Sequence, residues 1–375
     1  MKIVIIGTAY PMRGGIAHYV ALLYKVLLDR GNEVKIISFK RQYPAIFFPG
    51  KTQQDLSKEV EPIPSEPLLD SIGPMSWIRT YLAIKRVKAD LVIFQYWMPF
   101  FAPCYAVISF LTRLLTNTKI LYLCHNIIPH ERRFEDRLLT RMGLRNVDYF
   151  IVQSQAVKND LLDFRPKAVY KEVPHPVYEI FSKSFDKSEA RKQLNLKQNE
   201  NVLLFFGYIR KYKGLHVLLN AMPKVLEQTP VKLLVAGEFY DNEQGYHDQI
   251  QQLGIQDSVA IIADYIPNEA VGLYFSAADV VVLPYISATQ SGIVQIAYNY
   301  NKPVITTNVG GLPEVIAEGK TGFIIASEDS EALAKSIINF FNIKDDVDFS
   351  KNISEYKKQF SWDRMAAEIE SFMIS

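Results

Sequence analysis

Short runs rich in valine and isoleucine alternate along the chain with longer amphipathic segments of helical length. This alternation is typical of a parallel sheet covered by helices on both faces, because its strands are buried on both sides and read as continuous apolar runs. The pattern therefore predicts an α/β protein with two successive doubly wound sheets. In the first half the predicted strands are Ile3–Ile6, Val34–Phe39, Leu91–Gln95, Ile120–His125 and Tyr149–Gln153. In the second half they are Val202–Gly207, Lys232–Ala236, Val259–Ile262, Val280–Pro284, Pro303–Thr306 and Gly322–Ile325.

The pattern breaks near the middle of the chain, at Pro174-His175-Pro176 and the polar segment Ser182–Glu189. Two prolines restrict the backbone and remove hydrogen-bond donors, so this stretch is predicted to be a linker. We expect one Rossmann-like domain over residues 1–175 and a second over 176–359, each of about 150–190 residues and long enough to bury a core. Ligands of such domains bind outside the carboxyl ends of the strands, here in a cleft between two facing domains.

Two other segments complete the predicted organisation. The proline-rich stretch Tyr43–Pro67 is predicted to be a long surface excursion of the first domain. The segment Phe360–Met373, with Trp362 near its start, predicts a final helix.

The composition fits a soluble globular protein. Of 375 residues, 49% are hydrophobic and 22% charged, and the net charge of +2 gives no whole-protein signal for nucleic acid binding. The run Ile3–Ile6 is too short for a signal peptide, and the longest apolar stretch, Leu91–Leu115, is interrupted by polar residues and prolines, so no membrane span is predicted. One disulfide between Cys104 and Cys124 is arithmetically possible, but both lie in apolar stretches, and buried thiols in a reducing cytoplasm are expected.

The segment Thr289–Val315, TQSGIVQIAYNYNKPVITTNVGGLPEV, holds the strongest functional signal. A polar turn ends at Gly292, an apolar helical run and a strand follow, and a second glycine turn stands at Gly310-Gly311. A Ser/Gly turn that feeds a helix presents unpaired backbone N–H groups and the positive end of the helix dipole, which together bind anions. The residues expected to bind such a ligand here are Thr289, Gln290, Ser291, Gly292, Ile293 and Gln295.

Two further loops carry ligand-binding signals. Gly14-Gly15 follows the first strand at the start of the helix Ile16–Arg30, but the glycines lack dinucleotide-binding spacing, and a plain structural turn is about as probable. After the strand Val202–Gly207, three cations crowd one loop: Arg210, Lys211 and Lys213. A charge cluster is usually a solvated face, but at the carboxyl end of a strand it can clamp a diphosphate.

His125 ends the strand Ile120–His125 and is followed by Asn126 and, shortly after, His130. A lone histidine is more often a satisfied structural residue than a functional one. Its place at the carboxyl end of a strand favours a role in a site.

Together these segments resemble the retaining glycosyltransferase family 4, the glycosyl transferases group 1. GGIAHYV at Gly14 looks like the family's GG-x-(E/A)-x-x-V opening, and the cationic loop looks like its GR-x-x-x-x-KG loop, with Lys213 at the lysine and Tyr208 in place of the arginine. The resemblance spans nearly the whole chain and implies the GT-B arrangement, with the final helix, residues 360–375, packed back on the first domain.

The resemblance also implies roles for individual residues. The glycines face the donor diphosphate and sugar, the histidine meets the donor sugar, the cations clamp the leaving diphosphate, and the loop after the strand Val259–Ile262 lines the nucleobase. The implied catalytic residues are His125, Arg210 and Lys213. The implied donor-binding residues are Gly14, Gly15, Glu238, Tyr265 and Ile266, with Thr289, Gln290, Ser291, Gly292, Ile293 and Gln295 of the polar turn. The implied acceptor-side residues are Asn126 and His130.

The implied reaction transfers a hexosyl or N-acetylhexosaminyl group from a nucleotide-diphosphate sugar, with retention and without a metal or other cofactor. The implied acceptor is a saccharide or lipid-linked saccharide in capsule, O-antigen or exopolysaccharide assembly. The implied place is the cytoplasm, peripheral on the inner face of the plasma membrane.

One departure from the family keeps alternatives open. The family writes the polar-turn segment with two glutamates eight residues apart, and the matching positions near Ala288 and Ile296 lack both. A carboxylate suits two ribose hydroxyls because it only accepts hydrogen bonds. A non-catalytic nucleotide-sugar binding protein and a nucleotide-sugar epimerase of the same fold therefore stay alternatives.

The segment Glu131–Arg145 combines five arginines with apolar residues on a predicted helix. A solvated helix balanced by acids and a patch that attracts anionic lipid are equally consistent with this pattern. The sole D-x-D, Asp346-Val347-Asp348, lies in a polar run that predicts a loop and not a metal site.

Overall fold

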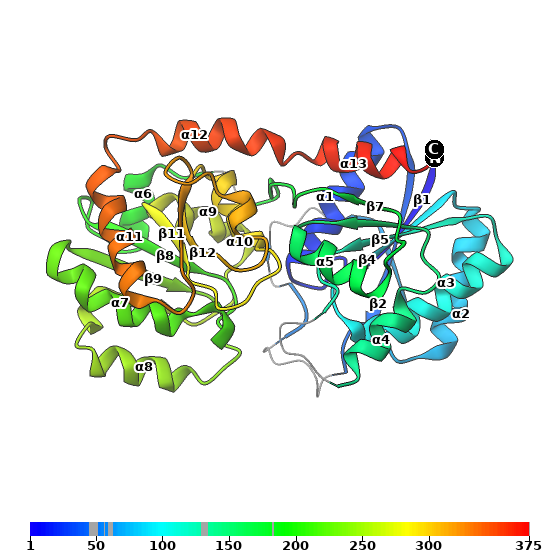
Figure 1. The fold of residues 1–375 in the computed structure, drawn as a ribbon, viewed down its shortest axis with the longest axis horizontal. Helices are drawn as coiled ribbons and strands as arrows, with labels where there is room; N and C mark the ends of the chain where they lie inside the picture. The colour runs from blue at the N-terminus through cyan, green and yellow to red at the C-terminus, as the bar shows by residue number, and fades with distance from the viewer. Residues whose placement is uncertain (45–51, 56, 59–62, 129–133, 182–183, 375) are drawn as a thin grey trace. The chain divides into compact units, whose positions relative to one another are not determined.

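The computed structural model describes residues 1–44, 52–55, 57–58, 63–128, 134–181 and 184–374 (Figure 1). Within these ranges the chain divides into two compact units. Unit 1 holds residues from 1–55, 61–176 and 360–375, and unit 2 holds residues from 56–60 and 177–359. Each unit is an α/β domain built on one parallel sheet, which confirms the predicted fold class.

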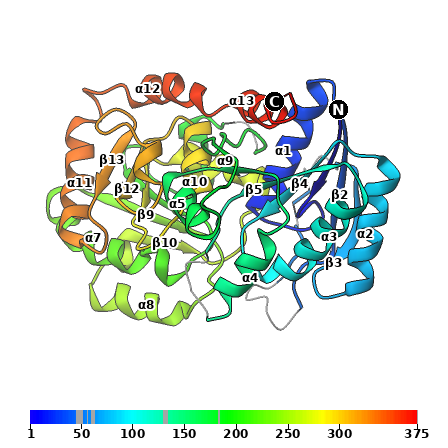
Figure 2. The same cartoon turned by 45° about the vertical axis from the view of Figure 1, so that its right-hand side comes forward.

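Unit 1 has a seven-stranded parallel sheet in the order β3-β2-β1-β4-β5-β6-β7. Helix α3 contacts both α2 and α4, and all three helices are labelled in Figure 2. The strands are β1 (Lys2–Ile6), β2 (Glu33–Arg41), β3 (Ser65–Asp70), β4 (Leu91–Tyr96), β5 (Lys119–Cys124), β6 (Tyr149–Val152) and β7 (Tyr170–Glu172). The helices are α1 (Gly15–Asp29), α2 (Pro74–Val87), α3 (Ala102–Leu115), α4 (Asp136–Gly143), α5 (Gln155–Phe164) and α13 (Trp362–Ser371).

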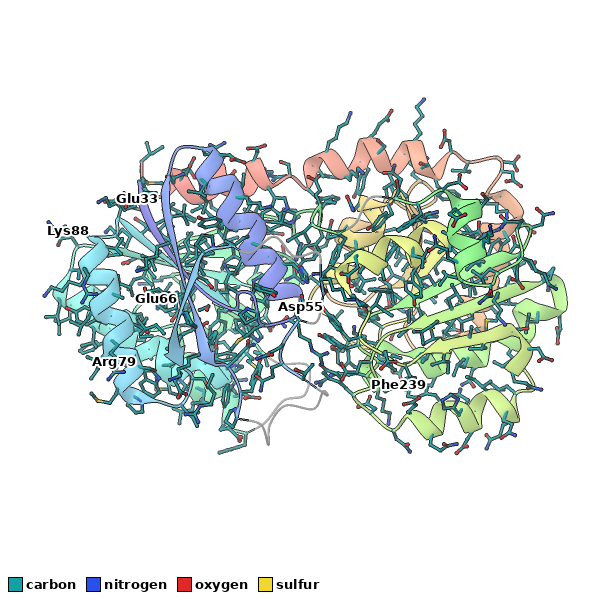
Figure 3. All side chains as sticks on the ribbon, turned by 180° about the vertical axis from the view of Figure 1, so that it is seen from behind. Glu33, Asp55, Glu66, Arg79, Lys88 and Phe239 are labelled. Atoms are coloured by element: carbon teal, nitrogen blue, oxygen red, sulfur yellow. The ribbon has the colours of Figure 1, made fainter. Side chains whose placement is uncertain are left out.

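The two outer strands of unit 1 were not predicted. β3 begins inside the stretch expected to be a surface excursion, so that expectation is wrong for Ser65–Pro67. Pro67 cannot donate to a ladder and is tolerated because β3 pairs on one side only, with β2. The salt bridge between Lys35 and Glu66, 2.6 Å long, supports this edge pairing, and Figure 3 labels Glu66 on the strand.

The final helix α13 packs within unit 1. Its Trp362 ring lies 4.8 Å from the Tyr19 ring, and Phe372 stacks on Tyr149 at 4.7 Å. Glu370 accepts hydrogen bonds from Arg30, at 2.8 Å, and from Asn32, at 2.7 Å. The end of the chain thus contributes to the core and surface of the unit that contains the first strand.

Unit 2 has a six-stranded parallel sheet in the order β10-β9-β8-β11-β12-β13. All six strands agree with the predicted ones to within one residue at each end. They are β8 (Asn201–Phe206), β9 (Val231–Ala236), β10 (Val259–Ile262), β11 (Val280–Leu283), β12 (Val304–Thr307) and β13 (Gly322–Ile325). The helices are α6 (Lys187–Gln193), α7 (Leu215–Gln228), α8 (Glu243–Gln252), α9 (Asn268–Ala277), α10 (Gly292–Asn299), α11 (Ser330–Ile343) and α12 (Phe349–Tyr356).

The predicted linker is more structured than its composition suggests. His175 is buried, and its Nδ1 lies 2.7 Å from the carbonyl oxygen of Pro176. The prediction of a linker over Ser182–Glu189 is wrong for its last residues, because α6 begins at Lys187 with Asp186 as its N-cap. Capping by Asp186 satisfies the first amides of the helix, which a count of polar residues does not reveal.

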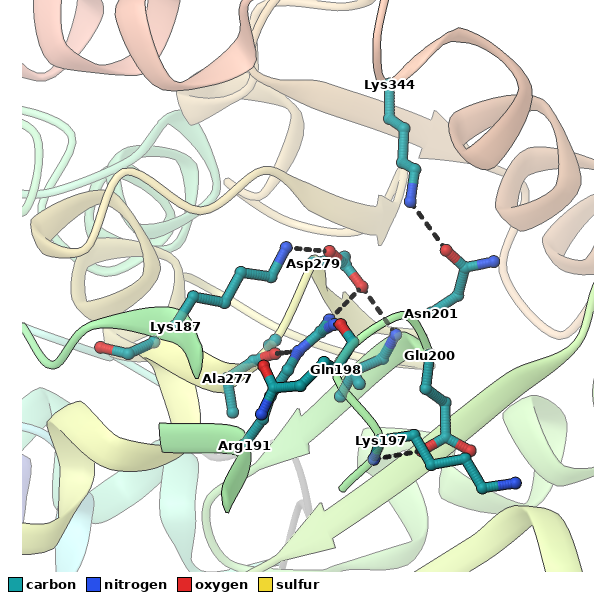
Figure 4. Close-up of polar contacts among 12 residues, drawn as sticks. Lys187, Arg191, Lys197, Gln198, Glu200, Asn201, Ala277, Asp279 and Lys344 are labelled. Atoms are coloured by element: carbon teal, nitrogen blue, oxygen red, sulfur yellow. Dashed lines mark hydrogen bonds and ion pairs between the residues drawn. The ribbon is translucent and has the colours of Figure 1, made fainter. Parts of the chain in front are cut away.

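A buried ion pair ties α6 to the amino ends of two strands of unit 2 (Figure 4). Arg191 Nη2 lies 3.0 Å from Asp279 Oδ2, and both side chains are less than one-tenth exposed. Asp279 also accepts from the backbone N–H of Val202 at 2.7 Å and pairs with Lys187 at 2.6 Å. Burial raises the pKa of Asp279, but these hydrogen bonds and charges outweigh it and lower the pKa overall.

Replacing Asp279 by alanine is expected to lower the free energy of unfolding by about 3–5 kcal/mol, because Arg191 would stay buried without its partner. Lys187→Ala removes the half-exposed partner of the same carboxylate and should cost about 1 kcal/mol or less. Urea unfolding at pH 7 measures both. Equal losses for the two variants would contradict the buried pair's role.

Candidate functional site

The loops with the strongest predicted donor residues meet at one place in unit 2. The strand order reverses direction between β8 and β11, and the loop after β8 carries Lys213, while the loop after β11 leads into α10. Ligands of doubly wound sheets bind at such a reversal, outside the carboxyl ends of the strands. The fold therefore brings together two loops that the sequence separates by about eighty residues.

Gly214 allows these two loops to touch. Its φ is 72°, and a Cβ at this position would lie 1.9 Å from the carbonyl oxygen of Pro284. Only glycine fits such an approach. A hydrogen bond of 2.7 Å from the backbone N–H of Ile286 to the carbonyl oxygen of Tyr212 fixes the contact.

Lys213 is a buried cation at this contact. Its Nζ lies 5.6 Å from the centroid of the Tyr285 ring, and among the described residues no carboxylate lies within ion-pair distance of it. Burial, and then the charge of Arg210, lower the pKa of Lys213 to about 8. A cation kept out of water without an anionic partner is suited to bind an anionic ligand.

The N-terminus of α10 lies beside the same tyrosine. Ser291 caps the helix, since its Oγ accepts from the backbone N–H of Ile293 at 3.2 Å. The Ser291 Oγ also lies 3.4 Å from the hydroxyl of Tyr285, whose ring faces Lys213. Tyr285 thus links the lysine to the helix end. Tyr285 was not predicted, because a tyrosine after a buried strand has no local sequence feature that indicates function.

The second glycine turn holds the first one in place. Gly310 has a φ of 54°, and a Cβ there would lie 1.7 Å from the carbonyl oxygen of Ala288. The backbone N–H of Gly311 donates to the carbonyl oxygen of Thr289 at 3.0 Å. The GG pair therefore positions the start of the polar turn that leads to Gly292.

Gln295 occupies the first turn of α10 and is 1% exposed. Its Oε1 has no hydrogen-bond partner among the described residues. A buried acceptor without a partner costs about 1–3 kcal/mol, so this oxygen is ready to accept from a ligand hydroxyl or N–H. The positions near the family glutamates, Ala288 and Ile296, hold buried apolar side chains.

The other predicted donor residues of unit 2 lie on neighbouring loops. Glu238 is buried, and its carbonyl oxygen accepts from the N–H of Ile209 at 2.9 Å, which joins the loops after β9 and β8. Tyr265 and Ile266 follow β10, further along the same edge, with Tyr265 half-buried. The guanidinium of Arg210 lies over the ring of Tyr240, 5.0 Å from its centroid.

The described residues that were predicted in unit 1 follow β1 and β5, the two strands on either side of β4, and the strand order reverses between β1 and β4. Gly14 is the N-cap of α1, with a φ of 115°, and a Cβ there would meet no heavy atom within 4 Å. Gly15 is exposed and opens the helix. The glycines leave room at a helix N-terminus, as an anion site requires.

His125 follows β5 and is buried. Its Nε2 lies 2.8 Å from Gln95 Oε1. Burial, and then the charge of His175, lower the pKa of His125 to about 3, so the ring is neutral near pH 7. Gln95 was missed as a partner, although a glutamine inside the apolar strand β4 is an unusual residue. Of the two acceptor-side residues, Asn126 is half-buried and His130 lies outside the described residues.

The buried histidines of unit 1, His18, His125 and His175, are expected to make the protein less stable in acid. Burial is the largest cause that lowers their pKa values from 6.5, to about 4, 3 and 4 respectively. Below pH 6.5 the unfolded chain then binds more protons than the folded one. The free energy of unfolding should fall toward pH 4 by about 1.4 kcal/mol per pH unit for each titrating histidine.

Urea unfolding between pH 7 and pH 4.5 measures this slope. His175→Gln should make it shallower, whereas His247→Gln, at an exposed position of α8, should leave it unchanged. A free energy of unfolding that stays constant over this range would contradict the prediction.

The arginine-rich segment is helical over α4, with Arg137, Arg141 and Arg145 exposed, and Arg132 and Arg133 lie outside the described residues. Asp346-Val347-Asp348 is a turn before α12, as predicted, and Asp348 caps that helix. Within the described ranges, no three His, Cys, Asp or Glu side chains gather as metal ligands. Nor does any described helix have the length and apolarity to cross a membrane.

Each half of the chain matches a known family model. Residues 13–177 match the model of Glycosyltransferase Family 4, and residues 186–360 match that of Glycosyl transferases group 1. A D-inositol 3-phosphate glycosyltransferase of Corynebacterium glutamicum is 22% identical over 91% of this chain and 84% of its own length. Spore coat protein SA of Bacillus subtilis is 32% identical, but over 49% of this chain and 51% of its own length.

Solved structures show the same fold. Sucrose-phosphate synthase from Thermosynechococcus elongatus superposes with a TM-score of 0.74 at 19% identity, over 99% of this chain and 98% of that one. Anabaena HepE, solved in complex with UDP-glucose, has a TM-score of 0.74 at 21% identity, over 99% of both chains. At such low identity these likenesses establish the GT-B type of fold, two Rossmann-like domains, and no more.

Proposed function

We propose that the chain moves a sugar from a nucleotide-diphosphate donor to a hydroxyl acceptor with retention. Two family matches support this proposal: residues 13–177 match Glycosyltransferase Family 4, and residues 186–360 match Glycosyl transferases group 1. The observation that carries the proposal is the buried Lys213 beside the N-terminus of α10. Both features stabilise negative charge, and the charge that develops in this reaction is on the departing diphosphate.

The proposed chemistry needs no protein nucleophile. The bond between the anomeric carbon and the diphosphate oxygen breaks, and the acceptor oxygen bonds to the anomeric carbon on the same face. The acceptor's proton passes to the departing diphosphate oxygen. Lys213, the α10 N-terminus and Arg210 stabilise the charge that this departure leaves on the diphosphate. The neutral His125 contributes a hydrogen bond to the donor sugar and does not act as an acid near pH 7.

The remaining roles follow from position. Gly14 and Gly15 would admit the diphosphate and sugar, and Glu238, Tyr265 and Ile266 would line the nucleobase. Thr289, Gln290 and Gln295 would replace the absent carboxylates as neutral partners of the sugar and ribose hydroxyls. HepE was solved with UDP-glucose, so this nucleotide sugar is the first hexosyl donor to test, and UDP-N-acetylglucosamine is the second.

The proposed acceptor is a saccharide or lipid-linked saccharide used in capsule, O-antigen or exopolysaccharide assembly. One solved neighbour of this fold, WaaG, is described as a glycosyltransferase involved in lipopolysaccharide biosynthesis, which supports testing such acceptors. We expect the enzyme to act at the cytoplasmic face of the plasma membrane.

Incubation with a panel of nucleotide sugars, with and without acceptors, tests the function. A new glycoside with the donor's anomeric configuration supports the proposal. The missing glutamates near Ala288 and Ile296 favour one rival, a non-catalytic nucleotide-sugar binding protein, which would bind donor and yield no product. An epimerase would instead release a changed sugar without any acceptor.

Transfer is expected to survive chelation of divalent metals. The lysine and the helix end supply the positive charge that a divalent ion would otherwise supply to the diphosphate. Assays with excess EDTA, against assays with added magnesium or manganese, measure the dependence. A complete loss of transfer in EDTA that either metal restores would overturn this expectation.

A further inference from the structure

Tyr19 lies at the centre of a buried cluster of rings in unit 1. It belongs to α1, one turn after the glycines that open this helix, and its side chain is fully buried. Its ring makes edge contacts with His125, His175 and Trp362, whose centroids lie 4.7, 5.1 and 4.8 Å away. These three rings come from segments that are far apart in the sequence. The tyrosine therefore joins parts of the unit that no single helix or strand holds together.

A polar connection adds to the contact between Tyr19 and His125. The Tyr19 hydroxyl accepts a hydrogen bond of 2.7 Å from the side-chain amide of Gln153, which follows β6 and is buried. Burial is the main cause that lowers the pKa of His125, and a side-chain hydrogen bond with the same Gln153 opposes this effect. The Nε2 of His125 also lies 2.8 Å from Gln95 Oε1. The histidine ring is thus held by the tyrosine and by two buried glutamines.

The other two rings belong to the segments where the chain passes between the units. One segment of unit 1 ends at Pro176, directly after His175, and the next begins at Phe360, two residues before Trp362. His175 is buried, and its Nδ1 lies 2.7 Å from the carbonyl oxygen of Pro176. Trp362 opens α13, which contacts α1, and Figure 2 shows the two helices side by side. Two passages of the chain therefore meet at the residue that contacts the candidate catalytic histidine.

Close packing gives this arrangement a consequence for the histidine. Protein interiors contain few voids, so a shift of His175 or Trp362 must be taken up by the Tyr19 ring between them and by the ring of His125. A misplacement of about 1 Å in a group that acts on the substrate can lower a rate by about 10²-fold. The rings around Tyr19 therefore influence whether His125 stands in its productive position.

We propose that Tyr19 is a positioning residue for His125, and that His175 and Trp362 make the position of this histidine depend on the two passages of the chain between the units. The proposal rests on the proposed function, in which His125 contacts the donor sugar. Tyr19 is fully buried and acts through the histidine. A purely structural tyrosine would instead affect the stability of the fold and leave the histidine where it is.

Trp362→Leu tests the connection to the passage before α13, because it removes the ring that lies against Tyr19. Phe372→Leu is the matched control, since Phe372 follows α13 directly and stacks on Tyr149 instead. Both variants should lower the urea midpoint of unfolding to a similar extent. Only Trp362→Leu should lower kcat, by about tenfold or more, while its affinity for uridine diphosphate, which carries no sugar, stays within about twofold of the wild type. Trp362→Phe keeps an aromatic edge and should restore most of the turnover.

Tyr19→Phe tests the polar connection separately. It keeps the ring contacts but removes the hydroxyl to which Gln153 donates, and it should lower kcat by about fivefold. Proton–nitrogen correlation spectra of the histidine rings supply a measurement that does not depend on activity, and the His125 signal is identified by its absence in His125→Gln. Trp362→Leu and Tyr19→Phe should shift this signal, whereas Phe372→Leu should leave it unchanged.

The outcomes separate this proposal from the proposed function. An unchanged His125 signal in both Trp362→Leu and Tyr19→Phe, or a shifted signal with wild-type turnover, would overturn the proposal. So would equal losses of kcat in Trp362→Leu and Phe372→Leu, because the loss would then follow stability alone. A wild-type chain that transfers no sugar would overturn the proposed function instead, and the spectra would still decide whether Tyr19 and Trp362 position His125.

Discussion

Replacing Lys213 by alanine is expected to lower the rate of sugar transfer by about 10²–10³-fold. The substitution removes one preorganised cation from the place where the diphosphate leaves, which corresponds to about 2–4 kcal/mol of transition-state stabilisation. Because Lys213 is buried and lies against Tyr285, no other side chain of its loop replaces it there. Steady-state kinetics with saturating acceptor measure the loss, and a turnover near that of the wild type would exclude this lysine from the site.

Lys211→Ala is the matched control. Lys211 lies two residues away in the same loop, but its side chain is exposed and its backbone N–H is held by Asp241. It should keep nearly full activity. The activity of Arg210→Ala is expected to lie between those of Lys213→Ala and Lys211→Ala. The Arg210 guanidinium lies over the ring of Tyr240, and its charge lowers the pKa of Lys213.

The pH dependence separates a functional lysine from a structural one. Since burial lowers the pKa of Lys213 to about 8, the free enzyme loses this charge as the pH rises through 8, and kcat/KM should fall there. Lys213→Arg should restore part of the activity and remove this alkaline limb, because a guanidinium stays charged. An alkaline limb that persists in Lys213→Arg would assign the titration to another group.

Most strands of the two sheets were predictable because a buried parallel strand appears in the sequence as an uninterrupted run of apolar residues. β10 and β13 were predicted to the residue, since Val259–Ile262 and Gly322–Ile325 are each preceded by a polar residue and are followed within two residues by another. β3 was missed because SEPLLD contains proline and two acids, which are tolerated only at an edge. The pairing of β3 with β2 depends on tertiary structure, and the sequence of β3 shows no apolar pattern that predicts it.

The candidate site was predictable only in part, for a similar reason. Glycines and cations next to predicted strands are recognisable in a sequence, so Lys213 and Gly310 could be selected as candidate site residues. The residues that contact the candidate site residues in the folded structure could not be predicted. Tyr285 acquires a role only because the β8 and β11 loops touch through Gly214, and Gln95 only because β4 lies beside β5. Such pairings depend on the order of the strands in the sheet. The sequence determines that order, but it cannot be read from a single sequence.

Gly292→Val is expected to weaken binding of the nucleoside diphosphate by about 10²-fold or more while the fold is kept. Gly292 opens α10, whose N-terminus is the proposed diphosphate contact, and a larger side chain there blocks close approach. A Cβ at this position already lies 3.0 Å from Cε2 of the buried Tyr178, so the ring must move slightly even for alanine. Calorimetric titration with uridine diphosphate measures the effect.

Gly245→Val serves as the control, because Gly245 lies in α8 and a Cβ there has no close contact. The double variant Tyr178→Ala/Gly292→Val separates two causes: recovered binding would mean that valine acts by displacing the tyrosine, and continued loss supports blockage of the helix end. Gln295→Glu should bind at least as well as the wild type. It places a carboxylate where the buried Gln295 Oε1 has no hydrogen-bond partner within the described part of the chain, one residue from the family's second glutamate position. Undiminished binding by folded Gly292→Val would show that the diphosphate does not approach the N-terminus of α10.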